Sequence, residues 1–281
     1  MKIVITGSSG FIGSKLLAKI DENKHTIIKV DLDQDFDVTN WNSVKSIKNF
    51  DVLVHLAAIT YVPSSYEKPR GMYEVNISGT LNMLELCRIN NAKMIFASSY
   101  VYGKPQYLPI DEIHPTVAFN PYCHSKLIGE DLCESYHKNF GVPIIIFRPF
   151  NIYGKGQDEN FLIPLIKKQI EQSETVKLND PRPKRDFLHV DDLVEAYIKA
   201  IEFKDPKLEV FNVGSGMSYS VEEIANIMIT SSKEKIKLEF SSEARINEVL
   251  DTVADTRKIK QMLNWQPKIS FIKGIETLMD G

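Results

Sequence analysis

The sequence has few cysteines, no long apolar run and no large excess of charge of either sign. The 3 cysteines, Cys87, Cys123 and Cys133, form no CxxC pair, and an odd number gives no disulfide framework. Free thiols in a reducing compartment are therefore expected. No apolar run reaches the roughly 18 residues of a membrane-spanning helix. The 34 basic and 37 acidic side chains give a net charge of −3, which is not the basic footprint of a nucleic-acid-binding protein and argues against adhesion to an anionic membrane.

The composition is otherwise that of a globular protein. Of the 281 residues, 43% are hydrophobic and 25% charged, and 14 glycines with 13 prolines are too few for a disordered chain. The N-terminal residues pass directly into a strand pattern, which leaves no room for a signal peptide. We find no internal repeat. The sequence thus predicts a soluble, cytoplasmic protein of one or two domains.

Short apolar runs alternate with segments of helical spacing up to residue 150. Strands are predicted at Lys2–Thr6, Thr26–Val30, Asp51–Leu56, Ala92–Ala97 and Val142–Phe147, with a further short strand at Asp37–Val38. Helices are predicted at Phe11–Ile20, Trp41–Ile47, Pro69–Asn90 and Asn120–Asn139. This alternation is typical of a parallel sheet covered on both faces.

The pattern changes after Pro149. Turns and short elements are expected from Asn151 to Arg185, and Glu209–Val213 is predicted as a strand that returns to the main sheet within 209–214. Further helices are predicted at Val190–Phe203, Val221–Ile229, Thr256–Leu263 and Ile272–Met279. We therefore predict a doubly wound α/β domain over residues 1–150 and a small, interleaved second domain over 151–281.

Three glycines follow the first strand and open the first helix. Gly7, Gly10 and Gly13 form the spacing GxxGxxG. Small residues let backbone N–H groups approach a pyrophosphate, and the helix N-terminus adds positive potential. The alternative, three ordinary turn glycines, is weakened by the strand before and the helix after them.

An acidic residue ends the second predicted strand. Asp31 stands about twenty residues beyond the glycine loop, where a carboxylate accepts hydrogen bonds from both ribose hydroxyls of an adenosine. It would repel a 2′-phosphate, so NAD is favoured over NADP. The alternative is a solvated carboxylate at a strand end.

A tyrosine and a lysine lie four residues apart on a predicted helix. Tyr122 and Lys126 share one helix face, and a nearby ammonium lowers the pKa of a phenol, which makes Tyr122 a usable acid and base. Ser98 follows a buried strand, where its hydroxyl is expected to share a substrate oxygen with Tyr122. An incidental surface pair and a turn serine are the alternatives. The histidines show no metal-ligand spacing, so no metal is predicted.

Several segments, in this order along the chain, resemble the extended branch of the short-chain dehydrogenase/reductase superfamily. Within that branch the sequence is similar to the nucleotide-sugar epimerases and dehydratases, such as UDP-glucose 4-epimerase. Besides the glycine loop, the matching segments are 55–58 (HLAA), 97–103 (ASSYVYG), 120–126 (NPYCHSK), 148–154 (RPFNIYG), 185–192 (RDFLHVDD) and 211–216 (FNVGSG).

The resemblance implies a Rossmann domain that binds NAD, a nucleoside diphosphate sugar as substrate, and a homodimer built on helices 69–90 and 120–139. The implied catalytic residues are Ser98, Tyr122 and Lys126. The implied cofactor contacts are Gly7, Gly10, Phe11, Ile12, Gly13, Asp31, Asp37, Val38, Leu56, Ala57, Ala58, Tyr122 and Lys126. The implied substrate contacts are Ser98, Asn151, Arg185 and Arg245, the asparagine and arginines serving the diphosphate.

The sequence also departs from that pattern. Only six residues separate Asp31 from Asp37, so the crossover after the second strand is shortened. Ser99 and Tyr100 stand where the 4,6-dehydratases carry Asp-Glu, so water elimination is not expected. The predicted function is an NAD-dependent nucleotide-sugar 4-epimerase. The alternatives are a 4-ketoreductase or 4-dehydrogenase of a deoxysugar nucleotide and a non-catalytic NAD-binding protein; the base and the sugar stay open.

Overall fold

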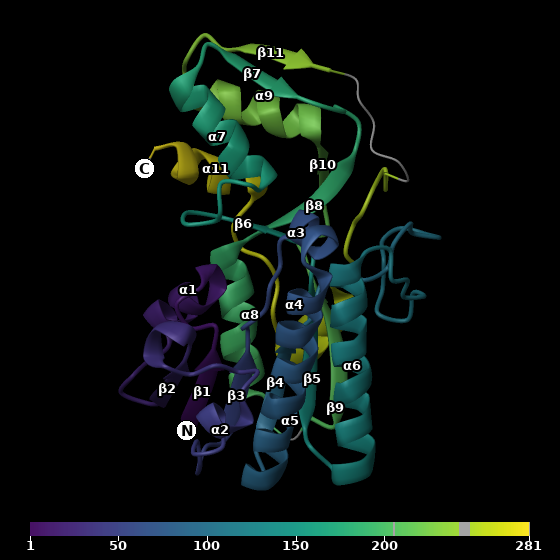
Figure 1. Cartoon of the computed structure of the whole chain (residues 1–281). Helices are drawn as coiled ribbons and strands as arrows, with labels where there is room; N and C mark the ends of the chain where they lie inside the picture. Colours follow the sequence, from purple (N-terminus) through teal and green to yellow (C-terminus); the bar gives the residue numbers. More distant parts are fainter. Residues whose placement is uncertain (205, 242–247, 281) are drawn as a thin grey trace.

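The computed structural model describes residues 1–204, 206–241 and 248–280 and consists of two lobes (Figure 1). The larger lobe is built on a six-stranded parallel sheet in the order β2-β1-β3-β4-β5-β9. Its strands are β1 (Lys2–Thr6), β2 (Thr26–Val30), β3 (Val52–His55), β4 (Lys93–Ala97), β5 (Ile144–Pro149) and β9 (Leu208–Val213). The predicted return strand is therefore present and lies beside β5.

Helices cover both faces of this sheet. One face carries α1 (Phe11–Lys19), α8 (Val190–Glu202) and α10 (Arg257–Leu263), and the other carries α2 (Trp41–Val44), α5 (Gly79–Asn90) and α6 (Pro121–Phe140). Successive side chains of a strand point to opposite faces, so Ile3 and Ile5 join the first core and Val4 the second. The predicted doubly wound α/β fold is confirmed.

The long predicted helix at 69–90 is one helical run of three parts. It begins with α4 (Pro69–Tyr73), passes through a π-helical turn at Glu74–Ser78 and ends with α5. A short helix, α3 (Val62–Glu67), precedes it and was not predicted.

The predicted short strand at Asp37–Val38 is wrong. The Asp37 carboxylate accepts hydrogen bonds from the backbone N–H of Thr39 at 2.9 Å and from its hydroxyl at 2.8 Å, which closes a turn. A short 3-10 turn at Leu32–Gln34 comes directly before it. The chain thus reverses too soon after β2 to add another strand at that edge of the sheet.

The smaller lobe contains a helix where the sequence analysis expected turns and short elements. Helix α7 (Leu162–Gln172) buries Ile163, Ile166 and Ile170, which follow helical spacing. Pro164 lies in the first turn, where no backbone N–H has an intrahelical partner. The spacing of these isoleucines is the signal in the sequence that indicates this helix.

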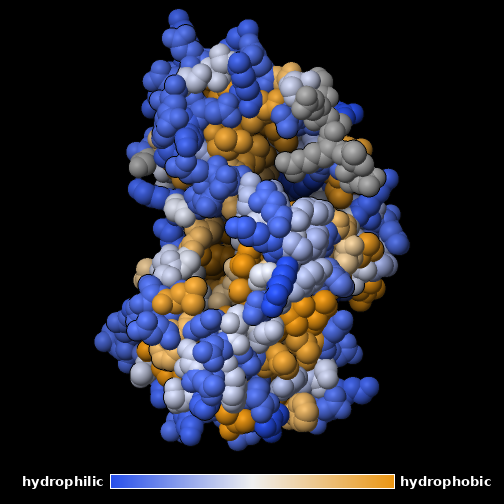
Figure 2. Space-filling view, viewed as in Figure 1, coloured by the Kyte–Doolittle hydropathy of each residue, from blue (hydrophilic) through white to orange (hydrophobic). Residues whose placement is uncertain are grey.

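The remaining elements of the smaller lobe form two small sheets and two helices. They are β6 (Asn151–Tyr153), β7 (Thr175–Leu178), β8 (Lys184–His189), β10 (Ser218–Ser220), α9 (Val221–Ser232), β11 (Lys237–Phe240) and α11 (Phe271–Met279). Figure 2 shows a recess between the two lobes that is partly lined by apolar residues. No helix in the described part of the chain is long and apolar enough to cross a membrane.

Candidate active site

The loop after β1 requires glycine for steric reasons. Gly7 has a φ of +67°, and a Cβ there would lie 2.7 Å from the backbone nitrogen of Ala57. A Cβ at Gly13 would lie 2.1 Å from the carbonyl oxygen of Gly7. The backbone therefore turns tightly into α1, with Phe11 and Ile12 as its first helical residues. Such a loop leaves the backbone accessible, as a dinucleotide pyrophosphate requires, so these residues fit NAD.

Asp31 lies next to the same loop. Its carboxylate accepts the backbone N–H of Ser9 at 2.9 Å and that of Leu32 at 2.9 Å. The end of β2 thus brings an acidic group to the glycine loop, as the spacing predicted. Its preference for an unphosphorylated ribose stays a prediction.

The other predicted cofactor contacts lie around this loop. The backbone N–H groups of Leu56 and Ala57 both donate to the Thr6 hydroxyl at 3.2 Å, which holds the end of β3 against β1. Ala58 follows and is half-buried. Val38 is buried, and its side chain lies against Gly79 of α5, where a Cβ would approach it to 3.0 Å. The adenine contact predicted for Asp37 and Val38 stays a prediction.

Helix α6 carries both the tyrosine and the lysine. Asn120 caps it by accepting the backbone N–H of Cys123 at 2.7 Å, and Pro121 occupies the first turn. Lys126 is buried, and its Nζ donates to the carbonyl of Ala97 at 2.8 Å and lies 5.2 Å above the Phe96 ring. The lysine therefore fastens the helix to the end of β4.

Two adjacent serines after β4 point to different partners. The Ser98 hydroxyl is buried and donates to Glu130 at 2.5 Å, whereas Ser99 hydrogen-bonds to Tyr122 through its side chain. Neighbouring side chains in extended backbone face opposite sides, which explains the division. In the free protein the Ser98 hydroxyl is taken up by Glu130, and its predicted hydrogen bond to a substrate oxygen stays a prediction. The hydroxyl that sequence reasoning missed is Ser99.

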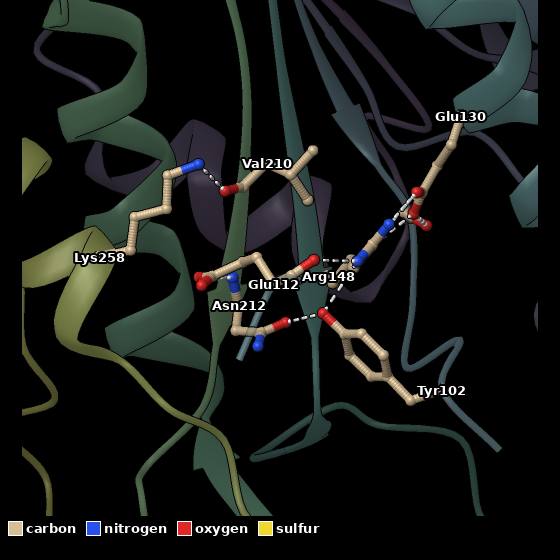
Figure 3. A network of polar contacts seen from close by, with 8 residues as sticks. Tyr102, Glu112, Glu130, Arg148, Val210, Asn212 and Lys258 are labelled. Carbon is tan, nitrogen blue, oxygen red and sulfur yellow. Dashed lines mark hydrogen bonds and ion pairs between the residues drawn. The ribbon is translucent and has the colours of Figure 1, made fainter. Parts of the chain in front are cut away.

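The carboxylate that binds Ser98 belongs to a buried polar network (Figure 3). Glu130 forms an ion pair with Arg148 of β5, at 2.5 Å between Oε2 and Nη2. Arg148 also donates to the Tyr102 hydroxyl at 3.0 Å, and that hydroxyl donates to Asn212 of β9 at 2.6 Å. The network joins the helix that carries Tyr122 to two strands of the main sheet.

The predicted diphosphate contacts lie on the smaller lobe. Asn151 donates to the backbone carbonyl of Asp186 at 3.2 Å. Arg185 donates to the carbonyl of Val249 at 2.6 Å and forms an ion pair with Glu248. The structure thus brings Asn151 close to the strand that carries Arg185. Arg245 lies outside the described residues.

A family model described as the NAD dependent epimerase/dehydratase family matches residues 3–214. The chain belongs to this family. The membership makes it an NAD-dependent epimerase or related oxidoreductase, as the resemblance implied.

Members with several activities are similar to this chain. A putative UDP-glucose 4-epimerase of Methanocaldococcus jannaschii is 32% identical over 306 residues, covering 99% of this chain and 97% of the relative. A GDP-6-deoxy-D-talose 4-dehydrogenase of Aggregatibacter actinomycetemcomitans is 29% identical over 285 residues, covering 98% and 95%. The structure of MoeE5 in complex with UDP-glucose and NAD is 26% identical, with a TM-score of 0.91, and covers 100% of this chain and 98% of that one.

Burial sets the protonation behaviour of this epimerase/dehydratase family site. It raises the pKa of Tyr122 to about 12, while the hydrogen bond from Ser99 acts in the opposite direction. Burial also lowers the pKa of Lys126 to about 8, although the nearby Cys133 thiol and Glu130 carboxyl act to raise it. The expected lowering of the Tyr122 pKa by Lys126 is therefore not met in the free protein. Withdrawal of the phenol from water is the largest influence on its pKa, and Lys126 is not among the groups that shift it.

Proposed function

We propose that this protein is an NAD-dependent nucleotide-sugar 4-epimerase. One observation carries the proposal: the Tyr122–Ser99 pair and the glycine loop lie at the same edge of the main sheet. Ser99 follows the end of β4, and the glycine loop, in which a Cβ at Gly13 would collide with the backbone, follows the end of β1. Ligands of doubly wound folds bind at this edge, outside the carboxyl ends of the strands. Relatives named as 4-epimerases support the assignment.

The residues of the chain divide the chemistry between them. The positive charges of Lys126 and of bound NAD⁺ would favour the Tyr122 phenolate, which would take the proton from the sugar 4-hydroxyl and later return it. Ser99 donates a hydrogen bond to the same oxygen. Lys126, whose Nζ donates to the carbonyl of Ala97, provides a positive charge at the end of β4. The glycine loop and Asp31 would hold NAD, which would supply the acceptor for a hydride from C4 and its return to the opposite face. Asn151, Arg185 and Arg245 hold the diphosphate, for which the planar arginine fork is suited.

A 4-ketoreductase or 4-dehydrogenase of a deoxysugar nucleotide is the second candidate. It uses the same residues but exchanges its cofactor at every turnover, and the similar GDP-6-deoxy-D-talose 4-dehydrogenase, 29% identical, favours it. A non-catalytic NAD-binding protein is disfavoured by the intact tyrosine, lysine and serine. Dehydration is disfavoured in addition, because the Tyr100 hydroxyl donates to Gly103 at 2.5 Å and no acid follows either serine.

The test is incubation of the purified protein with a panel of UDP, GDP, CDP and dTDP sugars, without added cofactor, followed by chromatography. An epimerase purifies with bound NAD and interconverts C4 epimers in this assay. A 4-dehydrogenase gives no product until NAD or NADP is added, and a 4-ketoreductase acts only on a 4-keto sugar nucleotide with NADH or NADPH. The Tyr122→Phe variant is the control, and unchanged turnover in it would contradict the proposed role of Tyr122.

We also propose a homodimer formed through α5 and α6. Leu81 and Ile89 on α5 are 41% and 43% exposed, and Phe140 at the end of α6 is 56% exposed. Apolar side chains on two neighbouring helices are typical of a four-helix interface with a second copy. Light scattering of the purified protein should give twice the mass of the chain, and a monomer would contradict the proposal.

A further inference from the structure

The carboxylate of Asp186 is fully buried and binds two other segments of the chain. Asp186 lies in β8 with 0% exposure. Its Oδ1 accepts the backbone N–H of Ser215 at 2.7 Å, with the Ser215 hydroxyl also at 2.7 Å. Its Oδ2 accepts the N–H of Gly216 at 2.9 Å and that of Ala254 at 3.0 Å. Three backbone donors on one carboxylate replace the water that burial removes.

Strand β8 and the bound segment that ends at Ala254 carry, or adjoin, the predicted diphosphate contacts. Arg185 is the preceding residue of β8, and Asn151 donates to the backbone carbonyl of Asp186 at 3.2 Å. The segment that ends at Ala254 includes Glu248 and Val249, and both accept from the Arg185 guanidinium. The carboxylate and the guanidinium therefore fix the same returning segment at two points.

The packing around this carboxylate leaves little freedom. A Cβ at Gly214 would lie 2.9 Å from Asp186 Oδ2 and 2.5 Å from the Ala254 Cβ. The loop after β9 and the segment before α10 are therefore held against β8. Displacing the carboxylate would release both of them from the strand that carries Arg185.

We propose that Asp186 is a positioning residue that holds the diphosphate-binding side of the site in its binding geometry. The inference rests on the proposed function, because it takes the assignment of Asn151 and Arg185 to a nucleoside diphosphate as given. Asp186 does not touch the ligand; it orders the backbone that presents those side chains. Its loss should therefore weaken nucleotide binding and leave the distant glycine loop unaffected.

A second buried carboxylate provides a matched control. Asp192, at the start of α8, is 2% exposed and accepts the backbone N–H groups of Lys268 at 3.1 Å and Ile269 at 2.9 Å. It also ties a later segment to the same region, but it contacts none of the predicted diphosphate residues. A change from aspartate to asparagine has the same chemistry at both positions, so any merely structural effect appears in both variants.

The test is isothermal titration of NAD-loaded protein with UDP, GDP, CDP and dTDP, and of cofactor-free protein with NAD. The amide of Asp186→Asn turns a donor toward at least one buried N–H, so its affinity for the nucleoside diphosphate should fall about tenfold or more. Its NAD affinity, and both affinities of Asp192→Asn, should stay within about twofold of the wild type. Ser215→Ala removes only the hydroxyl and should lower the affinity for the same nucleoside diphosphate about threefold. If Asp186→Asn does not fold, Ser215→Ala alone provides the test.

Unchanged nucleotide affinity in Asp186→Asn, or in Ser215→Ala if that variant stands alone, would overturn the inference. Equal losses in Asp186→Asn and Asp192→Asn would overturn it as well, since they would indicate a general structural effect. A wild type that binds NAD but none of the four nucleoside diphosphates would instead overturn the proposed substrate class, and the inference with it.

Discussion

Two neighbouring serines show how strongly a single side chain depends on its direction. Ser98 and Ser99 have the same chemistry and adjacent positions, yet one donates to a buried carboxylate and the other to the phenol of Tyr122. The Ser98 proton is held by Glu130, which is itself held by Arg148. Only Ser99 is therefore available to a group bound beside Tyr122.

The first prediction separates these two serines. Ser99→Ala should lower kcat by about 10²-fold, because it removes a hydrogen bond to the reacting phenol. Ser98→Ala should change kcat by less than about threefold but lower the free energy of unfolding by about 1–3 kcal/mol, because it leaves a buried carboxylate short of a donor. Steady-state kinetics and urea unfolding of both variants check this. A larger loss of kcat in Ser98→Ala would restore the original assignment.

The second prediction concerns Lys126. Burial lowers its pKa from 10.5 to about 8, so between these pH values the unfolded chain binds more protons than the folded one. The stability of the wild type should therefore rise with pH across this window relative to a variant that lacks the lysine.

Lys126→Met supplies that variant. At pH 7 the full cost of burying the ammonium is present, so the variant should be more stable by up to about 3 kcal/mol, less the lost bond to Ala97. The difference should shrink as the pH rises from about 8 to 10.5. Urea unfolding of both proteins at pH 7 and pH 10 measures it. A difference that does not change with pH would contradict the assigned burial effect.

Among the elements, the turn from β1 into α1 has the tightest steric requirement. The third prediction is that Gly13→Ala abolishes NAD binding, because its Cβ would lie 2.1 Å from a backbone oxygen and force the loop apart. Gly71→Ala is the control: nothing lies within 4 Å of its Cβ, and alanine in a helix should stabilise it by about 0.5–1 kcal/mol. Fluorescence titration with NAD and thermal unfolding compare the two. Retained NAD affinity in Gly13→Ala would refute the steric argument.

Helix α7 shows where element prediction from pattern failed. Its buried isoleucines at 163, 166 and 170 follow helical spacing, so the signal was present in the sequence. Pro164 does not interrupt the helix, because a proline in the first turn costs no hydrogen bond. The strand predicted at Asp37–Val38 was wrong for a different reason. The Thr39 N–H donates to the Asp37 carboxylate and closes a turn where a strand was expected.

For the molecule as a whole, the main feature is that the chain crosses between its lobes several times. After the smaller lobe begins, β9 returns to the main sheet, and α10 packs on the same core as α1 and α8. Ile259, Leu263 and Trp265 are buried there, and the Trp265 ring N–H donates to the carbonyl of Asp192 at 2.9 Å. The larger lobe is therefore incomplete without residues far along the chain.

The fourth prediction follows from this interleaving. A chain that ends at residue 250 lacks α10 and should not give a cooperative fold, because it exposes the apolar surface that those three side chains cover. Near-UV circular dichroism and urea unfolding should show loss of fixed packing relative to the full chain. A sharp, native-like transition in the shortened chain would contradict the prediction.

The sequence by itself determined which segments form the six strands of the main sheet, the glycine loop, the acidic Asp31 at the end of β2, and the placing of Tyr122 and Lys126 on one helix. These features follow from local spacing, which a linear pattern records directly. The tertiary structure alone decided which serine meets Tyr122, that burial raises the pKa of the phenol, and that Asp186 joins segments about 30 and 70 residues away. These features depend on side-chain direction, on exclusion of water and on contacts between distant segments, and a linear pattern contains none of the three.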